Sequence, residues 1–208
     1  METFFFIIVL LFAVMVHEIS HGAVANALGD PTAKYAGRLT LNPLKHLEPW
    51  GSFFVPLMLL LFSGGRFVFG WAKPVPYNPY NLKYQRWGPA IVGFAGPAAN
   101  FSLAVIFAAL IRVADYYNFG PSSFFLFFHI IVWVNLLLGV FNLMPIPPLD
   151  GSKIIFSAMP YSWEPLKIFL EQYGFVILIL FLLFGFRSLI PIILSIYGLL
   201  VGPSSLLI

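Results

Sequence analysis

Long apolar stretches, separated by short segments rich in glycine, proline and charge, are the dominant pattern along this 208-residue chain. A membrane-spanning helix needs roughly 20 consecutive apolar residues. Three stretches have about that length, at about 4–28, 89–113 and 123–143. A fourth, at 174–208, is about 35 residues long. It is compatible with one span and an interfacial tail or with a tight hairpin of two helices, and we favour the hairpin.

A fifth apolar stretch, Trp50–Phe62, is too short to cross and contains Pro56, so we expect a re-entrant or interfacial helix there. The segments 37–43 and 71–77 beside it are typical of extended chain, in which proline is restricted to edge strands. Because backbone N–H and C=O groups cannot stay unpaired in lipid, these segments should pair with each other or line a wet cavity. The pattern therefore predicts an all-α polytopic membrane protein with four to five transmembrane helices, a re-entrant segment and a small membrane-associated β element.

The composition supports lipid as the main solvent. Only 9% of the residues are charged, 60% are hydrophobic and 24 are phenylalanine, and the mean hydropathy is +0.92. A water-soluble domain averages roughly 25% charged residues. These values exclude a cytosolic enzyme, a nucleic-acid-binding protein and a disordered chain. The absence of cysteine excludes disulfides, thiolate metal ligands and cysteine catalysis.

The distribution of basic residues predicts the orientation in the membrane. Lysine and arginine concentrate on the cytoplasmic side of membrane proteins. Seven of the 11 lie in one part of the chain, at Lys34, Arg38, Lys45, Arg66, Lys73, Lys83 and Arg86. That segment is therefore expected in the cytoplasm, with the N-terminus and the turn at 114–118 outside.

The first apolar stretch contains the sequence His17-Glu18-Ile19-Ser20-His21. On a helix, His17 and His21 project from one face and can reach one metal ion. Glu18 then lies beside the metal, where it can take a proton from a water molecule. The alternative is a hydrogen-bonded polar patch. Because ionisable groups inside a span are costly and a metal would neutralise them, we favour the metal site.

A third protein ligand is expected, since catalytic zinc has three protein ligands and a water. Asp150 in the sequence Pro147-Pro148-Leu149-Asp150-Gly151 is the best candidate. Taken alone, this sequence could equally be an ordinary turn and helix cap. Asn100 lies on a line of small residues in the second span, and its buried amide needs a partner that the metal site could supply.

Three motifs occur in order, at 17–22 (HEISHG), 96–100 (GPAAN) and 142–151 (NLMPIPPLDG). Together they resemble the signatures of the site-2 protease family of intramembrane zinc metalloproteases. The resemblance covers about 4–159, and the chain closely resembles the compact prokaryotic branch, which lacks PDZ and CBS domains. It implies one membrane domain over 1–208, with a catalytic core at about 4–159 and C-terminal helices at about 174–208.

By the same resemblance, His17, His21 and Asp150 would bind one zinc ion and Glu18 would be the general base. Asn100 and Asn142 would be catalytic polar groups near the water, and the regions of Arg38 and Lys73 would form the β element that holds an unwound substrate. Three other polar residues are interpreted as structural or interfacial: His46, Glu48 and His129.

The sequence therefore predicts a prokaryotic multi-pass cell-membrane protease with its active site towards the cytoplasm. Its expected partners are the lipid bilayer and single-span membrane proteins or their cleaved remnants. A metal-ion transporter would also place histidine and aspartate within spans, but has no need of Glu18. A non-catalytic scaffold that binds membrane helices would retain the fold and be free to lose Glu18.

Overall fold

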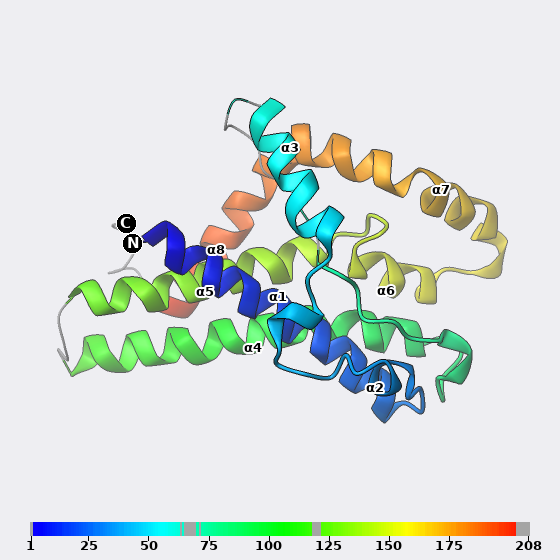
Figure 1. The fold of residues 1–208 in the computed structure, drawn as a ribbon, viewed down its shortest axis with the longest axis horizontal. Coiled ribbons are helices and arrows are strands. Elements are labelled where there is room, and N and C mark those ends of the chain that lie inside the picture. The colour runs from blue at the N-terminus through cyan, green and yellow to red at the C-terminus, as the bar shows by residue number, and fades with distance from the viewer. Residues whose placement is uncertain (1, 63, 65–69, 71, 118–121, 203–208) are drawn as a thin grey trace.

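The computed structural model describes residues 2–62, 64, 70, 72–117 and 122–202. Over these ranges the regular secondary structure is entirely helical, with no strand (Figure 1). The α-helices are α1 (Glu2–Ala27), α2 (Thr32–Tyr35), α3 (Val55–Phe62), α4 (Gly88–Tyr116), α5 (Ser122–Asn142), α6 (Asp150–Ala158), α7 (Glu164–Leu180) and α8 (Leu189–Val201). Short helical turns lie at Pro43–Lys45, Trp50–Phe54, Pro79–Asn81, Tyr161–Trp163, Phe181–Gly185 and Phe186–Ser188.

Four helical segments of the described chain are long and apolar enough to cross a membrane. Three of them, Phe4–Ala27, Gly88–Tyr116 and Phe125–Asn142, coincide with the first three predicted spans. The fourth, Tyr161–Val201, contains 41 residues. The prediction of a polytopic helical membrane protein is therefore confirmed.

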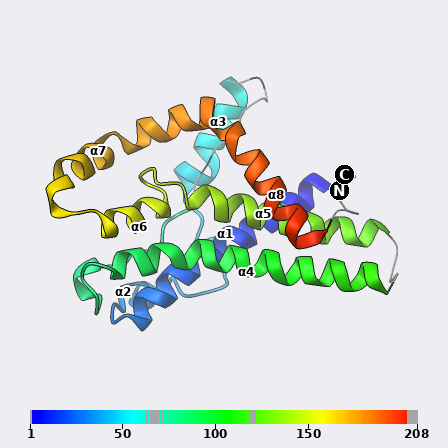
Figure 2. The same cartoon turned by 180° about the vertical axis from the view of Figure 1, so that it is seen from behind.

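The predicted C-terminal hairpin is not formed within the described residues. The helical path begins at Glu164 and continues through Phe181–Ser188 into α8. It bends there without folding back on itself (Figures 1 and 2). The chain stays helical because the π and 3-10 turns keep the backbone hydrogen-bonded. Pro191 lies in the first turn of α8, where a missing N–H costs nothing. Residues 203–208 of the predicted block lie outside the described residues.

The core is divided among three clusters. The largest joins α4, α5 and α8 through buried side chains that include Ile111, Leu136 and Ile193. A second joins α1 and α5 around Ala13 and Val134. A third joins α1 and α4 to the loop before α4 around Ala25, Val92 and Leu82. The middle of α1, which carries the histidines, is therefore enclosed by α4 and α5.

The predicted β element is absent from the described residues, and Trp71 and Arg66 lie outside them. Segments 38–45 and 72–74 do lie together. They are joined mainly by one side chain and not by a ladder of backbone hydrogen bonds. The Arg38 guanidinium donates to the carbonyl oxygens of Lys45, Lys73 and Pro74. One backbone hydrogen bond also joins this part of the chain, from Lys73 N–H to His46 O at 2.9 Å. A regular ladder is not available because Pro43, Pro74 and Pro76 lack N–H donors.

The segment predicted to be re-entrant, Trp50–Phe62, forms a π-helical turn followed by α3. It projects from the helices that enclose the histidines (Figure 1), and apolar side chains such as Phe54, Leu61 and Phe62 are exposed.

Candidate metal centre

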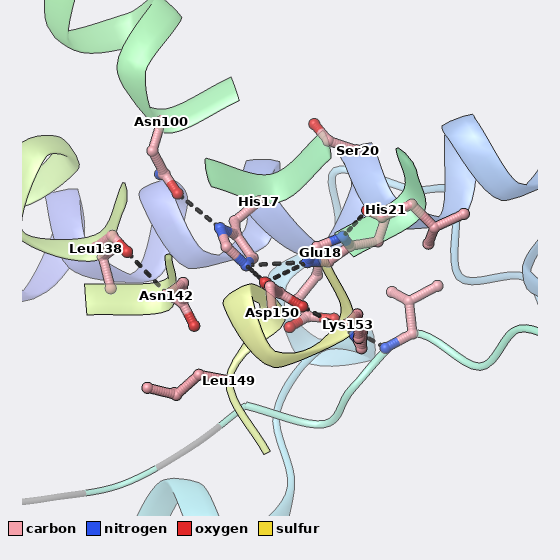
Figure 3. A network of polar contacts seen from close by, with 12 residues as sticks. His17, Glu18, Ser20, His21, Asn100, Leu138, Asn142, Leu149, Asp150 and Lys153 are labelled. Atoms are coloured by element: carbon pink, nitrogen blue, oxygen red, sulfur yellow. Dashed lines mark hydrogen bonds and ion pairs between the residues drawn. The ribbon is translucent and has the colours of Figure 1, made fainter. Parts of the chain in front are cut away.

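His17 and His21 lie one turn apart on α1 and are 5% and 7% exposed. Their spacing places both imidazoles on the face that is covered by α4, as the sequence predicted. The rings meet edge to face, with centroids 4.6 Å apart. Figure 3 shows both rings directed at the N-terminus of α6.

Asp150 is the first residue of α6 and is 6% exposed. The loop after α5 brings it to the histidines from a position 133 residues later in the chain. Gly151 makes this loop possible, because a Cβ atom there would lie 2.1 Å from the Leu143 carbonyl oxygen. Two backbone segments meet at that point, so no larger residue fits.

The three predicted ligands form a nearly equilateral triangle. Asp150 Oδ2 lies 3.0 Å from His17 Nε2 and 3.0 Å from His21 Nε2. The two Nε2 atoms are also 3.0 Å apart. Among the described residues, this trio is the one group of histidines and carboxylates arranged to hold a metal ion.

The other nitrogen of each ring fixes its protonation. His21 Nδ1 lies 2.6 Å from the Val92 carbonyl oxygen, which can only accept, so Nδ1 carries the hydrogen. His17 Nδ1 lies 2.6 Å from Asn100 Oδ1. In both neutral rings the lone pair is therefore on Nε2, the atom that points into the triangle.

The orientation of the Asn100 amide follows from its neighbours. Its Nδ2 donates to the Ala13 carbonyl at 3.3 Å and to Asn135 Oδ1 at 2.9 Å. Both partners are acceptors there, so Oδ1 must face His17. Asn100 and Asn135 are 0% and 1% exposed. They form a buried relay that holds the His17 ring by its rear nitrogen.

This arrangement fits a cation. Two nitrogen lone pairs and a carboxylate oxygen would repel one another at 3.0 Å unless a positive ion lay among them. Tetrahedral ligands at about 2.0–2.1 Å from zinc are about 3.3 Å from one another. Two imidazoles and one carboxylate are also a donor set of catalytic zinc sites.

Gly96 on α4 keeps the space in front of the two rings open. A Cβ atom at this position would lie 2.5 Å from Nε2 of both His17 and His21. In the sequence, Gly96 begins the motif at 96–100 and lies on the same line of small residues as Asn100, Ala104 and Ala108. This line divides: Gly96 and Asn100 face α1, whereas Ala104 and Ala108 belong to the cluster with α5 and α8.

Lys153, one turn into α6, binds the second oxygen of the ligand carboxylate. Its Nζ lies 2.9 Å from Asp150 Oδ1, which leaves Oδ2 for the metal. Burial alone would raise the pKa of the Asp150 carboxyl, but its polar contacts with the His17 and His21 rings and the Lys153 charge hold it well below its usual range. Burial likewise opposes the Lys153 charge, but Asp150 raises the pKa of the ammonium group.

Glu18 and Asn142 line a pocket that reaches the triangle. The pocket has a volume of about 140 Å³ and is also lined by Pro74, Val75, Tyr77, Pro148 and Lys153. Glu18 accepts a hydrogen bond from the Val75 N–H at 2.8 Å. Asn142 donates to the Leu138 carbonyl at 3.0 Å, which leaves its amide oxygen available to the pocket. Asn100 is not among the lining residues and contacts the site through His17.

The residues interpreted as structural have protein partners. His129 shares a hydrogen bond with the Tyr197 hydroxyl, and His46 Nε2 donates to the Thr40 carbonyl at 2.9 Å. Neither belongs to the triangle.

Comparison with known proteins gives the same assignment. The family model described as "Peptidase family M50" matches residues 5–120 and 117–185. The chain belongs to this family. A Bacillus subtilis (strain 168) member named "Putative zinc metalloprotease YwhC" is 39% identical over 183 residues, covering 85% of this chain and 80% of its own length. No solved structure matches.

A second M50 relative, named "Putative zinc metalloprotease Rip2", comes from Mycolicibacterium smegmatis (strain ATCC 700084 / mc(2)155). It is 29% identical over 173 residues, which cover 83% of this chain and 64% of the relative. The family and the names of these relatives confirm the predicted site-2 protease resemblance and the zinc metalloprotease that it implied.

Three residues at this centre were not predicted to act on it: Gly96, Asn135 and Lys153. The sequence carries a weak signal for Lys153, since it lies three residues after Asp150 and so shares its helix face. Nothing in the sequence alone places Asn135 against Asn100.

Proposed function

We propose that this M50 peptidase hydrolyses peptide bonds of transmembrane substrate segments, with His17, His21 and Asp150 holding one zinc ion. The single observation that carries the proposal is the triangle of Nε2 and Oδ2 atoms, 3.0 Å on each side, beside a carboxylate that is not part of it. Zinc, when bound, supplies a Lewis acid that polarises the scissile carbonyl and acidifies water.

Glu18 is the general base. It lines the pocket beside the triangle without occupying a ligand position. Its carboxylate takes a proton from the attacking water and passes it to the leaving amine. Asn142 presents its amide to the same pocket, where it can bind the substrate backbone.

The His17 and His21 rings are held in the productive tautomer by Asn100 and Val92. Holding the ligands in place before the substrate arrives lowers the cost of reaching the transition state. Asn100 therefore acts through His17 and not on the substrate.

A helical substrate hides its carbonyl groups in its own hydrogen bonds, so it must unwind before cleavage. Pro74, Val75 and Tyr77 of the extended segment line the pocket, so an unwound substrate strand can lie beside them without a regular ladder. The Trp50–Phe62 segment, with its exposed apolar side chains, is proposed to enter the membrane beside it. Single-span membrane proteins, or remnants of earlier cleavage, are the substrates this arrangement suits.

The proposed location is the cell membrane, with the pocket towards the cytoplasm. The N-terminus of α1, the end of α4 and the end of α8 lie at one end of the structure, and α2 lies at the other (Figures 1 and 2). The clustering of lysine and arginine around α2 and the loops near it supports a cytoplasmic position for that end.

The proposal is tested with purified protein reconstituted into vesicles with a single-span substrate. Glu18→Gln should abolish cleavage and leave zinc stoichiometry unchanged. Glu171→Gln is the matched control, since the same change occurs at an exposed position on α7. Equal cleavage by wild type and Glu18→Gln would refute the mechanism. Zinc transport across the vesicle membrane that survives in Glu18→Gln would favour the transporter.

A further inference from the structure

A short proline-flanked segment crosses α1 next to the general base. Pro74 and Pro76 have no N–H group, so the tripeptide Pro74-Val75-Pro76 contains a single backbone donor. That donor, the Val75 N–H, is directed at Glu18 Oε2 at a distance of 2.8 Å. The contact joins residues 57 positions apart in the sequence.

The fold fixes the direction of this donor from both sides. Before Val75, the Arg38 guanidinium donates to Lys73 O at 2.6 Å and to Pro74 O at 3.4 Å. After it, the Asn78 N–H donates to Asp30 Oδ2 at 2.6 Å. Asp30 is itself completely buried. The segment is therefore anchored independently of Glu18, and the carboxylate conforms to the segment.

The side chain of Val75 sets the distance between the segment and α1. It is 7% exposed and packs on Gly22, one turn beyond Glu18. A Cβ atom on Gly22 would lie 2.8 Å from Val75 Cγ1 and 2.7 Å from Leu39 Cδ2. Glycine at this position allows the segment to approach closely enough for the N–H to reach the carboxylate.

We propose that the Val75 N–H is a positioning group for the general base. It holds Oε2 and leaves the second carboxylate oxygen, Oε1, directed to accept the proton of the attacking water. A glutamate carboxyl rotates almost freely about its last bond, so one fixed oxygen selects the productive orientation of the other. This assignment rests on the proposed role of Glu18. The opposite possibility is a resting contact that keeps Glu18 away from water until the substrate takes the N–H.

The sharpest test replaces Val75 by α-hydroxyvaline in the full-length, zinc-loaded protein. This exchange substitutes an ester oxygen for the N–H and keeps the side chain. Val75→Pro removes the same donor by ordinary mutagenesis, and Val75→Ala is the matched variant that keeps the donor and trims the side chain. Cleavage kinetics on a single-span substrate, zinc stoichiometry and Tm are measured for all three.

The ester variant and Val75→Pro should lose kcat by about 10- to 100-fold, the effect of removing one charge-assisted hydrogen bond. KM should change by less than about threefold, because the lost interaction acts on the base and not on substrate binding. Val75→Ala should retain most of the wild-type kcat, because it keeps the N–H donor. The zinc stoichiometry should stay at the wild-type level in every variant.

Three results would overturn the positioning role: an ester variant with the kcat of wild type, a kcat above wild type, or a loss explained by lost zinc or by KM alone. A raised kcat would identify the resting contact. Glu18→Gln, measured in parallel, separates this proposal from the function itself. If Glu18→Gln is inactive and the ester variant is fully active, only the positioning role fails. If Glu18→Gln cleaves normally, the proposed function fails.

Discussion

Gly96→Ala tests the metal centre with a single added methyl group. The new Cβ would lie 2.5 Å from Nε2 of both His17 and His21, whereas carbon and nitrogen in contact are about 3.4 Å apart. One or both rings must therefore move by about 0.5–1 Å. Zinc ligands tolerate roughly 0.2 Å, so zinc affinity should fall by at least about 100-fold, which is about 2.7 kcal/mol.

Gly96→Ala should lower zinc affinity without unfolding the protein. Alanine favours helix over glycine by about 1 kcal/mol, so α4 itself should be stabilised by the change. We expect zinc affinity, measured by competition with a chromogenic chelator, to collapse while the helical circular dichroism is retained. Gly139→Ala is the matched control, because its Cβ would meet the Phe101 ring at 3.1 Å and not the histidines. Zinc affinity within threefold of wild type in Gly96→Ala would refute the geometry.

Three further predictions concern the groups around the ligands. Asn100→Ala should weaken zinc binding by about 10- to 100-fold by freeing the rear nitrogen of His17, and Asn100→Asp should restore it; equal affinity in Asn100→Ala would contradict the relay. Lys153→Met should weaken zinc binding by about tenfold in the same competition assay, because the free oxygen of Asp150 loses its donor; unchanged affinity would show that Lys153 does not position the ligand. Burial opposes the charge of Asp30, but bonds from Thr32, Asn81 and Asn78 lower the pKa of its carboxyl, so its stabilisation is complete above about pH 4 and is lost as the pH falls through the lower folded value. Asp30→Asn should therefore lower the stability at pH 7 by about 1–3 kcal/mol, seen as a lower Tm. The difference in Tm between Asp30→Asn and wild type should shrink in acid; a difference in Tm that does not depend on pH would contradict this.

The helical frame was predictable because it depends on local composition. Spans such as Gly88–Tyr116 are long and predominantly apolar, and lipid admits few alternatives to a helix there. The C-terminal bend could not be predicted in this way. Pro191 falls in the first turn of α8, where proline is tolerated.

The ligand set was also predictable, because the spacing of His17 and His21 fixes a shared helix face and the buried charge requires an ion. The supporting residues were not. Whether Asn135 reaches Asn100 depends on the packing of α5 against α4, and whether Gly96 faces two imidazoles depends on the rotation of α4 against α1. The expected β pairing failed for a similar reason, since Arg38 satisfies carbonyl groups that a partner strand would otherwise have used.

X-ray absorption at the zinc edge of the purified protein tests the central claim most directly. The account predicts one zinc ion per chain with two imidazole nitrogens and a carboxylate oxygen at about 2.0–2.1 Å. Asp150→Ala should lose the carboxylate contribution and retain both imidazoles. A wild-type spectrum without two imidazole ligands, or one that Asp150→Ala leaves unchanged, would contradict the proposed metal centre.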